Sequence, residues 1–373
     1  MSTLHKLTPN LSSPILFKEL IYYFLAFQLS FRILLLTIEN GGASMKKIKV
    51  IEMGGTISAQ GTDRLDLKDY TSGKFTGVHF SEEIPELNKV ANVSFESFLR
   101  VSSTEVNATH WIQLRNKVTN FLLDEDFDGI VITHGTNTLE ETAYFLHLTV
   151  PSEKPIVCVG AQRPFTSLSS DAHLNLLQAI RVAASDEAYN KGVLVVLNDE
   201  ISSAREVTKT NTYRLEAFQS GQFGYLGFVD PDKNVHFYRQ PTRKHTTSSE
   251  FSSLEISDLP NVEIAYSYAG ATGHLIQHIT KSGTYQGIVA AGTGAGLVSP
   301  SEIEALQEAT KKGLFVVRSS RVGNGRVVPI EPYKQYPFIS GDNLIPQKAR
   351  ILLMLSLVKY HTIQEIQTIF DKY

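Results

Sequence analysis

The chain has 373 residues, enough for two domains with sizeable cores, and its formal net charge is −3. That charge provides no basic field that would attract nucleic acid or an anionic membrane, so we expect neither partner. Cys158 is the single cysteine, which excludes an internal disulfide and a cysteine metal cluster and favours a reducing compartment.

Residues 1–44 differ from the rest of the chain. Residues 15–38 are rich in Leu, Ile, Phe and Tyr, but three charges interrupt them, and a membrane-spanning helix needs roughly 20 residues nearly free of charge. A signal peptide or membrane anchor is our second interpretation. Our first is that translation starts at Met45, directly before a predicted strand, and that residues 1–44 are an upstream over-read. The intact mass of the natural protein tests this.

The first predicted strand covers residues 48–53 and ends at Gly54-Gly55, which allows a sharp turn. Residues 61–78 are polar with few apolar anchors, and their length predicts a mobile loop that closes over a site. Apolar residues at helical spacing then predict a helix from Asn107.

A second strand-to-turn unit lies at residues 129–142, GIVITHGTNTLEET. Its apolar run predicts a strand that is buried on both faces of a parallel sheet. A polar turn follows, and the Thr138/Glu141 pair predicts a capping box at the start of a helix. Such a unit places hydroxyls and backbone N–H groups at the carboxyl edge of a sheet, where open α/β proteins bind ligands.

Strands and helices continue to alternate to the end of the chain. We expect further strands at 155–160, 192–197, 262–266, 287–291 and 314–317, and helices at 174–184, 300–312, 346–358 and 362–370. This alternation predicts an α/β fold with a doubly wound, mostly parallel sheet in a large N-terminal domain and a smaller α/β C-terminal domain. After the doubtful leader at 1–44, the expected parts are an N-terminal domain at 45–240, a linker at 241–258 and a C-terminal domain at 259–373.

Three residues attract attention as possible catalysts. Thr56 follows a glycine turn, Tyr70 lies in the predicted loop, and Lys209 stands in an uncharged run. A threonine hydroxyl becomes a nucleophile only when a base activates it, and a tyrosine or a partly desolvated lysine is such a base. Taken singly, a turn cap, a surface aromatic and a solvated lysine explain these residues as well.

Other chemistry finds little support. Residues 292–296, GTGAG, miss the spacing of a dinucleotide-binding loop, and the eleven histidines show no metal-binding spacing. We therefore expect no cofactor and no metal.

Seven motifs together are similar to those of the bacterial-type L-asparaginase/glutaminase family, in its order and spacing. They are GGTIS at 54, YTSGK at 70, HGTNTLEET at 134, GAQRPFTSLSSD at 160, NDEISSAREVTKTNT at 198, VVRSSRVGNG at 316 and NLIPQKARILL at 343. The resemblance spans residues 45–359. It implies an enzyme that needs no cofactor and hydrolyses the side-chain amide of L-asparagine, in some members also of L-glutamine, to the acid and ammonia.

The resemblance also implies roles for single residues. Thr56 would be the nucleophile that forms an acyl-enzyme, with Tyr70 as its activator on a closing loop. Thr136 and Lys209 would be a second hydroxyl and its base, which activate a threonine or water. Backbone N–H groups near Thr136 would stabilise the oxyanion.

Substrate binding is implied for further positions. Ser103 would hold the substrate α-carboxylate with Thr104 beside it, and Ala161 would line the same crevice. The family assembles as a homotetramer of tight dimers in which each site borrows an acid from its neighbour, and Glu331 is the best local match for that acid. We therefore expect a homotetramer or homodimer with shared sites.

Asn137 departs from the family motif, which reads HGTDT. The family's aspartate lies beside the lysine and the substrate ammonium, whereas an amide supplies no charge. Losing one charge-assisted contact should cost about 1.5–3 kcal/mol. Ala295 is a second departure, at a turn where the family often has asparagine. We therefore predict a weakened or retuned enzyme.

Two alternatives stay open at this point. Asn137 alone motivates a non-catalytic amino-acid-binding relative. An amidotransferase-like subunit would need an additional folded N-terminal domain and a partner, for which residues 1–44 are too short and too apolar. We favour a cytoplasmic enzyme that acts on a small-molecule substrate.

Overall fold

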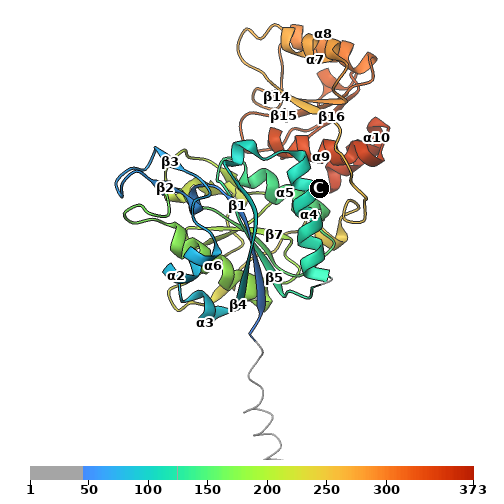
Figure 1. Ribbon diagram of the computed structural model, residues 1–373. Helices are drawn as coiled ribbons and strands as arrows, with labels where there is room; N and C mark the ends of the chain where they lie inside the picture. The colour runs from blue at the N-terminus through green and yellow to red at the C-terminus, as the bar shows by residue number, and fades with distance from the viewer. Residues whose placement is uncertain (1–44, 124) are drawn as a thin grey trace, which may run out of the picture. The chain divides into compact units, whose positions relative to one another are not determined.

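A computed structural model describes residues 45–123 and 125–373 (Figure 1). The interpretation of residues 1–44 as an over-read or a signal lies outside the described residues. Among the helices of the described ranges, none has the length and apolar character needed to cross a bilayer.

The first sheet has eight strands in the order β12-β11-β8-β7-β6-β5-β1-β4. The five strands from β7 to β4 in this order pair in parallel, whereas β8, β11 and β12 add an antiparallel edge. The prediction of a mostly parallel sheet is confirmed. The strand bounds are β1 Lys47–Gly54, β4 Asn92–Val101, β5 Gly129–Thr133, β6 Ile156–Val159, β7 Val193–Leu197, β8 Glu200–Ser203, β11 Gly227–Val229 and β12 Val235–Phe237.

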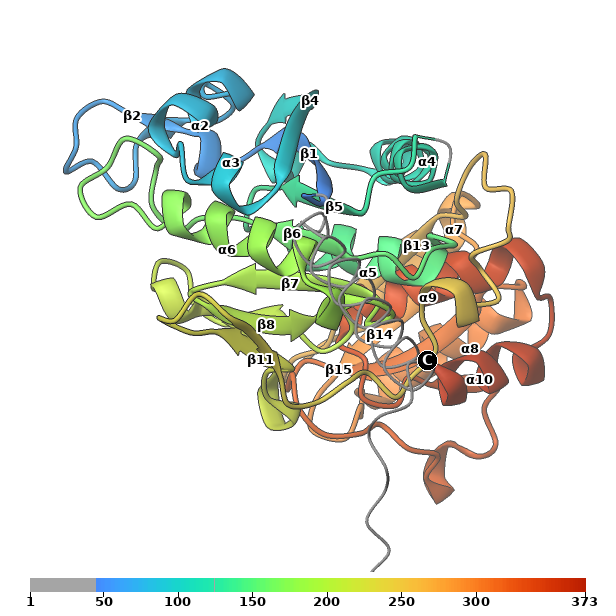
Figure 2. The same cartoon turned by 90° about the horizontal axis from the view of Figure 1, so that it is seen from below.

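Helices cover both faces of this sheet, which explains why its central strands β5 and β7 are buried along their whole length. In Figure 2, α2, α3 and α6 lie on one side of the sheet and α4 and α5 on the other. The helix bounds are α2 Gly77–Glu83, α3 Leu87–Val90, α4 Ala108–Leu123, α5 Leu139–Thr149 and α6 Ala172–Ala184.

The second sheet has four parallel strands in the order β13-β14-β15-β16. Helices α7 and α8 pack on one face, and α9 packs on the other. A capping box between Ser299 and Glu302, with Pro300 in the first turn, starts α8, so the helix predicted at residues 300–312 is confirmed. The bounds are β13 Val262–Tyr266, β14 Gly287–Gly292, β15 Phe315–Ser320, β16 Phe338–Ser340, α7 His274–Ser282, α8 Pro300–Lys311, α9 Pro346–Lys359 and α10 Ile363–Lys372.

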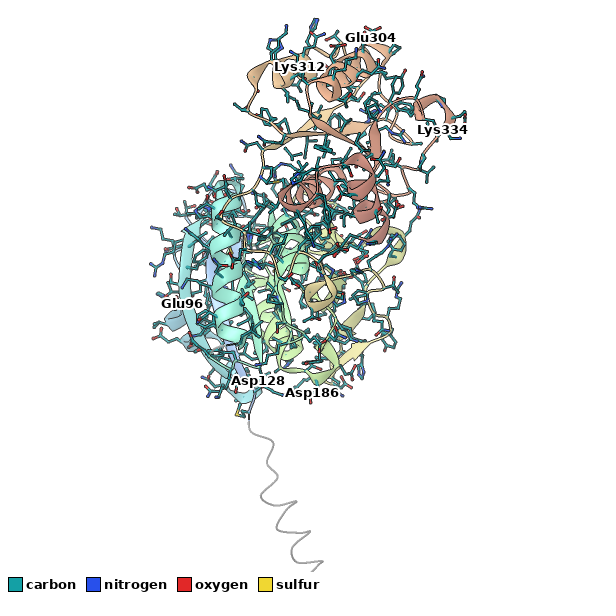
Figure 3. The ribbon with its side chains drawn as sticks, turned by 90° about the vertical axis from the view of Figure 1, so that its right-hand side faces the viewer. Glu96, Asp128, Asp186, Glu304, Lys312 and Lys334 are labelled. Carbon is teal, nitrogen blue, oxygen red and sulfur yellow. The ribbon has the colours of Figure 1, made fainter. Side chains whose placement is uncertain are left out.

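Helix α9 links the two sheets. It contacts β13, β14 and β15 of the second sheet and also α5 of the first, and one hydrophobic core runs through all of them. Residues 241–258, the expected linker, pack against this core, because Phe251 is fully buried in it and its ring lies 5.3 Å from that of Tyr373. Charged side chains project outward, as Figure 3 shows for Glu96 and Lys312.

Candidate active site

The first hydroxyl-bearing turn follows β1. Gly54 and Gly55 have φ of 92° and 81°, which a side chain would strain, and they turn the chain into a 3-10 helix at Thr56–Ser58. A Cβ on Gly55 would lie 2.3 Å from the Cα and N of Gly135. Only glycine therefore allows this turn to touch the turn after β5. Thr56, the next residue, lies at the edge of the sheet and is 7% exposed.

The second hydroxyl-bearing turn follows β5, the parallel neighbour of β1. Because both strands end at the same edge, Thr136 lies in the turn beside Thr56 and is 5% exposed. Helix α5 starts at Leu139 with Thr138 as its N-cap, but the predicted capping box is wrong. The Thr138 hydroxyl donates instead to the carbonyl of Ser103 at 2.7 Å, so it ties the turn to the loop after β4.

Tyr70 meets the first hydroxyl. Its Oη lies 3.0 Å from Oγ1 of Thr56, and either atom is able to donate. Residues 61–78 are not one irregular loop: β3, Tyr70–Thr71, pairs with β2, Gln60–Gly61, and the segment then runs into α2. A short hairpin thus holds the phenol over the turn.

Lys209 meets the second hydroxyl. It ends the short strand β9, Thr208–Lys209, and its Nζ donates to Oγ1 of Thr136 at 2.7 Å. Burial lowers the pKa of Lys209, and the negative charge of Glu140 partly offsets that effect. The amine is therefore closer to losing its proton at neutral pH than an exposed lysine.

A pocket of about 550 Å³ joins both pairs. Its lining consists of Thr56, Tyr70, Thr136, Asn137, Glu140, Gln162, Lys209, Thr210, Asn211, Thr212, Tyr213 and Gln347. Two hydroxyls, each within hydrogen-bond distance of a group that can take its proton, face one small-molecule volume. Such an arrangement supports acyl transfer, in which a hydroxyl attacks a carbonyl carbon.

The other predicted binding residues lie outside this lining. Ser103 is 2% exposed, and its Oγ has no hydrogen-bond partner in the described part of the chain. The Thr104 hydroxyl lies at the surface, 2.9 Å from that of Ser102. Ala161 follows β6 in the chain and is fully buried.

Glu331 belongs to the C-terminal part of the chain. Its side chain is 84% exposed in the turn Glu331–Tyr333 and pairs with Lys334 at 2.5 Å. It does not line the pocket of its own chain.

Sequence reasoning missed several lining residues. Gln162, Asn211 and Gln347 all lie inside motifs quoted for the family resemblance, so position within those motifs was the available signal. Glu140 is the most informative of the missed residues, because it accepts hydrogen bonds from the Lys209 backbone N–H and from Gln347, both at 2.6 Å. Across residues 45–123 and 125–373, no group of three or more His, Cys, Asp and Glu is placed to bind a metal.

The fold is α/β with two sheets and the site suits acyl transfer; comparison with known proteins identifies the chain as an amidohydrolase and specifies its family. Residues 47–243 match the family described as Asparaginase, N-terminal, and residues 261–370 match the Glutaminase/Asparaginase C-terminal domain. The chain belongs to the asparaginase/glutaminase family, which confirms the resemblance read from the motifs.

Individual relatives are similar in sequence to this chain over about nine-tenths of its length. L-asparaginase 2 of Bacillus subtilis is 42% identical over 340 residues, 90% of each chain. Glutaminase-asparaginase of Pseudomonas fluorescens biotype A is 40% identical over 332 residues, which cover 88% of this chain and 91% of the relative. The crystal structure of a probable cytoplasmic L-asparaginase from Campylobacter jejuni matches with a TM-score of 0.85 at 39% identity, covering 88% of this chain and 100% of that one.

Proposed function

We propose that the chain hydrolyses the side-chain amide of L-asparagine to L-aspartate and ammonia through an acyl-enzyme on Thr56. The observation that carries this proposal is the convergence of the Tyr70–Thr56 and Lys209–Thr136 pairs, 3.0 and 2.7 Å apart, on one pocket. The relatives named as L-asparaginase and glutaminase-asparaginase support the substrate class.

In the first step, Thr56 Oγ1 attacks the amide carbon and passes its proton to the Tyr70 oxygen, while the phenol passes its own proton on to the amide nitrogen. The carbonyl oxygen becomes an oxyanion near the backbone N–H groups at Thr136, which suit it because they are fixed in place before charge develops. The C–N bond then breaks, and ammonia leaves an ester on Thr56.

In the second step, water attacks the ester carbon. Lys209 in its neutral form takes a proton through Thr136, which the lowered pKa of the buried amine favours. The ester C–O bond breaks, the proton returns to Thr56, and L-aspartate is released. No cofactor enters the balance of either step.

Ammonia release from L-asparagine and L-glutamine by purified protein tests the function. Thr56→Ala should abolish release, whereas Thr136→Ala should slow the second step and let an aspartyl ester accumulate on Thr56, visible in the intact mass after acid quenching. Thr71→Ala, on the same hairpin as Tyr70 but exposed and outside the pocket, is the matched control and should keep wild-type turnover. Release that survives Thr56→Ala would refute the proposal.

A non-catalytic amino-acid-binding protein is the second candidate, because Asn137 in the pocket lining carries no charge. It predicts that calorimetry detects L-asparagine binding while no ammonia appears, and that neither Thr56→Ala nor Thr136→Ala abolishes binding. Turnover by the wild-type protein removes this candidate.

We further propose a homotetramer or homodimer in which Glu331 of one chain completes the site of its neighbour. The exposure of Glu331 and its absence from its own pocket support this. Light scattering gives the oligomer size, and Glu331→Gln should raise KM without dissociating the oligomer. A cytoplasmic location, supported by the Campylobacter jejuni relative, is tested by cell fractionation.

A further inference from the structure

The acid that faces Lys209 is itself held by the C-terminal part of the chain. Glu140, the second residue of α5, is only 5% exposed. Its Oε2 accepts the backbone N–H of Lys209, and its Oε1 accepts Nε2 of Gln347, both at 2.6 Å. A carboxylate near a helix N-terminus is favoured by the helix dipole, and two donors replace the water it lost on burial.

Helix α9 supplies more than Gln347. Lys348, the next residue, is fully buried, and its Nζ donates to the carbonyls of Ala204, Arg205 and Val207. These carbonyls belong to the segment that leads into Lys209. The first turn of α9 therefore holds Lys209 from two directions, through its preceding backbone and through Glu140. Figures 1 and 2 both draw α9 beside α5, in agreement with their contacts.

We propose that Glu140 and Gln347 are positioning residues that hold Lys209 against Thr136, so that the C-terminal part of the chain orients the proposed base. The carboxylate does this in two ways. Its hydrogen bond fixes the Lys209 backbone, and its negative charge favours the ammonium form and so limits how far burial lowers the pKa of Lys209. The inference rests on the proposed role of Lys209 as a base.

Several charged groups surround this network, among them Arg350, whose charge acts on Glu141. Glu140 is the carboxylate that acts on Lys209. Glu141, on the same helix, acts on Lys348, as do Glu140 itself, Glu206 and Arg205. Glu141 offers a comparison, because Glu140→Gln and Glu141→Gln make the same substitution at adjacent positions of one helix. Burial raises the pKa of Glu141 to about 7, so the comparison is made above that pH, where both carboxyls are ionised.

The test measures the pKa of Lys209 without relying on turnover. Acetylation of Lys209 by acetic anhydride, followed against pH by peptide mass spectrometry, reports the fraction of free amine. Glu140→Gln should lower that pKa by about one unit, because one nearby opposite charge is lost. The acid limb of kcat/KM for ammonia release should shift to lower pH by the same amount, while Glu141→Gln should leave both unchanged.

Gln347→Met tests the orientation of Lys209 separately from its pKa. It removes the hydrogen-bond donor to Glu140 and leaves the negative charge of Glu140 in place. It should lower kcat roughly tenfold with little change in KM, because misplacing a catalytic group by a fraction of an ångström is costly. It also keeps the proposal falsifiable should Glu140→Gln fail to fold.

The outcomes separate the two proposals. If no variant or wild type releases ammonia but Glu140→Gln still lowers the pKa of Lys209, the function fails and the positioning role stands. If the pKa of Lys209 does not move in Glu140→Gln, or moves equally in Glu141→Gln, the role of Glu140 is overturned. A Gln347→Met protein with wild-type kcat overturns the role of Gln347.

Discussion

The substitution Asn137→Asp should raise kcat/KM for L-asparagine. Asn137 lines the pocket next to Thr136, and a carboxylate there would attract both the ammonium of Lys209 and that of a bound amino acid. Two unit charges about 4 Å apart attract with roughly 1 kcal/mol in water and roughly 4 kcal/mol at the effective dielectric of a protein surface. Because Asn137 is exposed, we take the lower part of that range, about 1.5 kcal/mol, and expect a gain of roughly tenfold in kcat/KM for L-asparagine.

The assay is steady-state ammonia release with L-asparagine across pH 6 to 9. The gain should lie mainly in KM, and the acid limb of kcat/KM should shift upward because the new charge raises the pKa of Lys209. Asn116→Asp, an exposed position on α4 outside the pocket, adds the same net charge and should change kcat/KM by less than about threefold. A loss of kcat/KM in Asn137→Asp would refute the reasoning and indicate a site adapted to another amide.

Three further predictions concern groups that the structure describes plainly. Tyr70→Phe removes the phenol oxygen beside Thr56 and should lower kcat by roughly 10²- to 10⁴-fold with a smaller effect on KM in steady-state assays; half of wild-type kcat would contradict this. Burial lowers the pKa of His147, so the folded protein keeps it neutral while the unfolded chain takes up a proton below about pH 6.5. Stability should therefore fall below that pH by up to about 1.4 kcal/mol per unit, and thermal melts of His147→Gln should show a flatter acid side. Burial also raises the pKa of Cys158 to about 12, so a thiol reagent should label the protein only after denaturation.

Long apolar strands and capped helices could be predicted from the sequence, because burial on both faces of a sheet leaves an unbroken hydrophobic run. The antiparallel edge of the first sheet could not be predicted, because β11 and β12 have three residues each and are too short to show an alternation of apolar and polar residues. Strand β4 is half-exposed along its length and gives no apolar run, and α7 is a short helix that the predicted elements omitted. In each case tertiary contacts define the element.

The proposed catalytic residues could be predicted only because their motifs occur together in the order and spacing of one family. Taken alone, the sequence around Thr56 does not differ from that of an ordinary turn. The capping box predicted at Thr138 does not form, because the Thr138 hydroxyl donates its hydrogen bond to the carbonyl of Ser103, which belongs to another loop. The bond between Glu140 and Gln347 joins side chains 207 positions apart, and no local pattern encodes a pairing at that separation.

The contact between Gly55 and Gly135 has a consequence for engineering. Since the two turns meet through bare backbone, a side chain at Gly55 would force the strands' ends apart and widen the gap between the Thr56 and Thr136 hydroxyls, and one at Gly135 would collide with Ser103. Efforts to admit a larger amide should therefore leave these two glycines unchanged and vary a lining residue such as Tyr213, which is exposed.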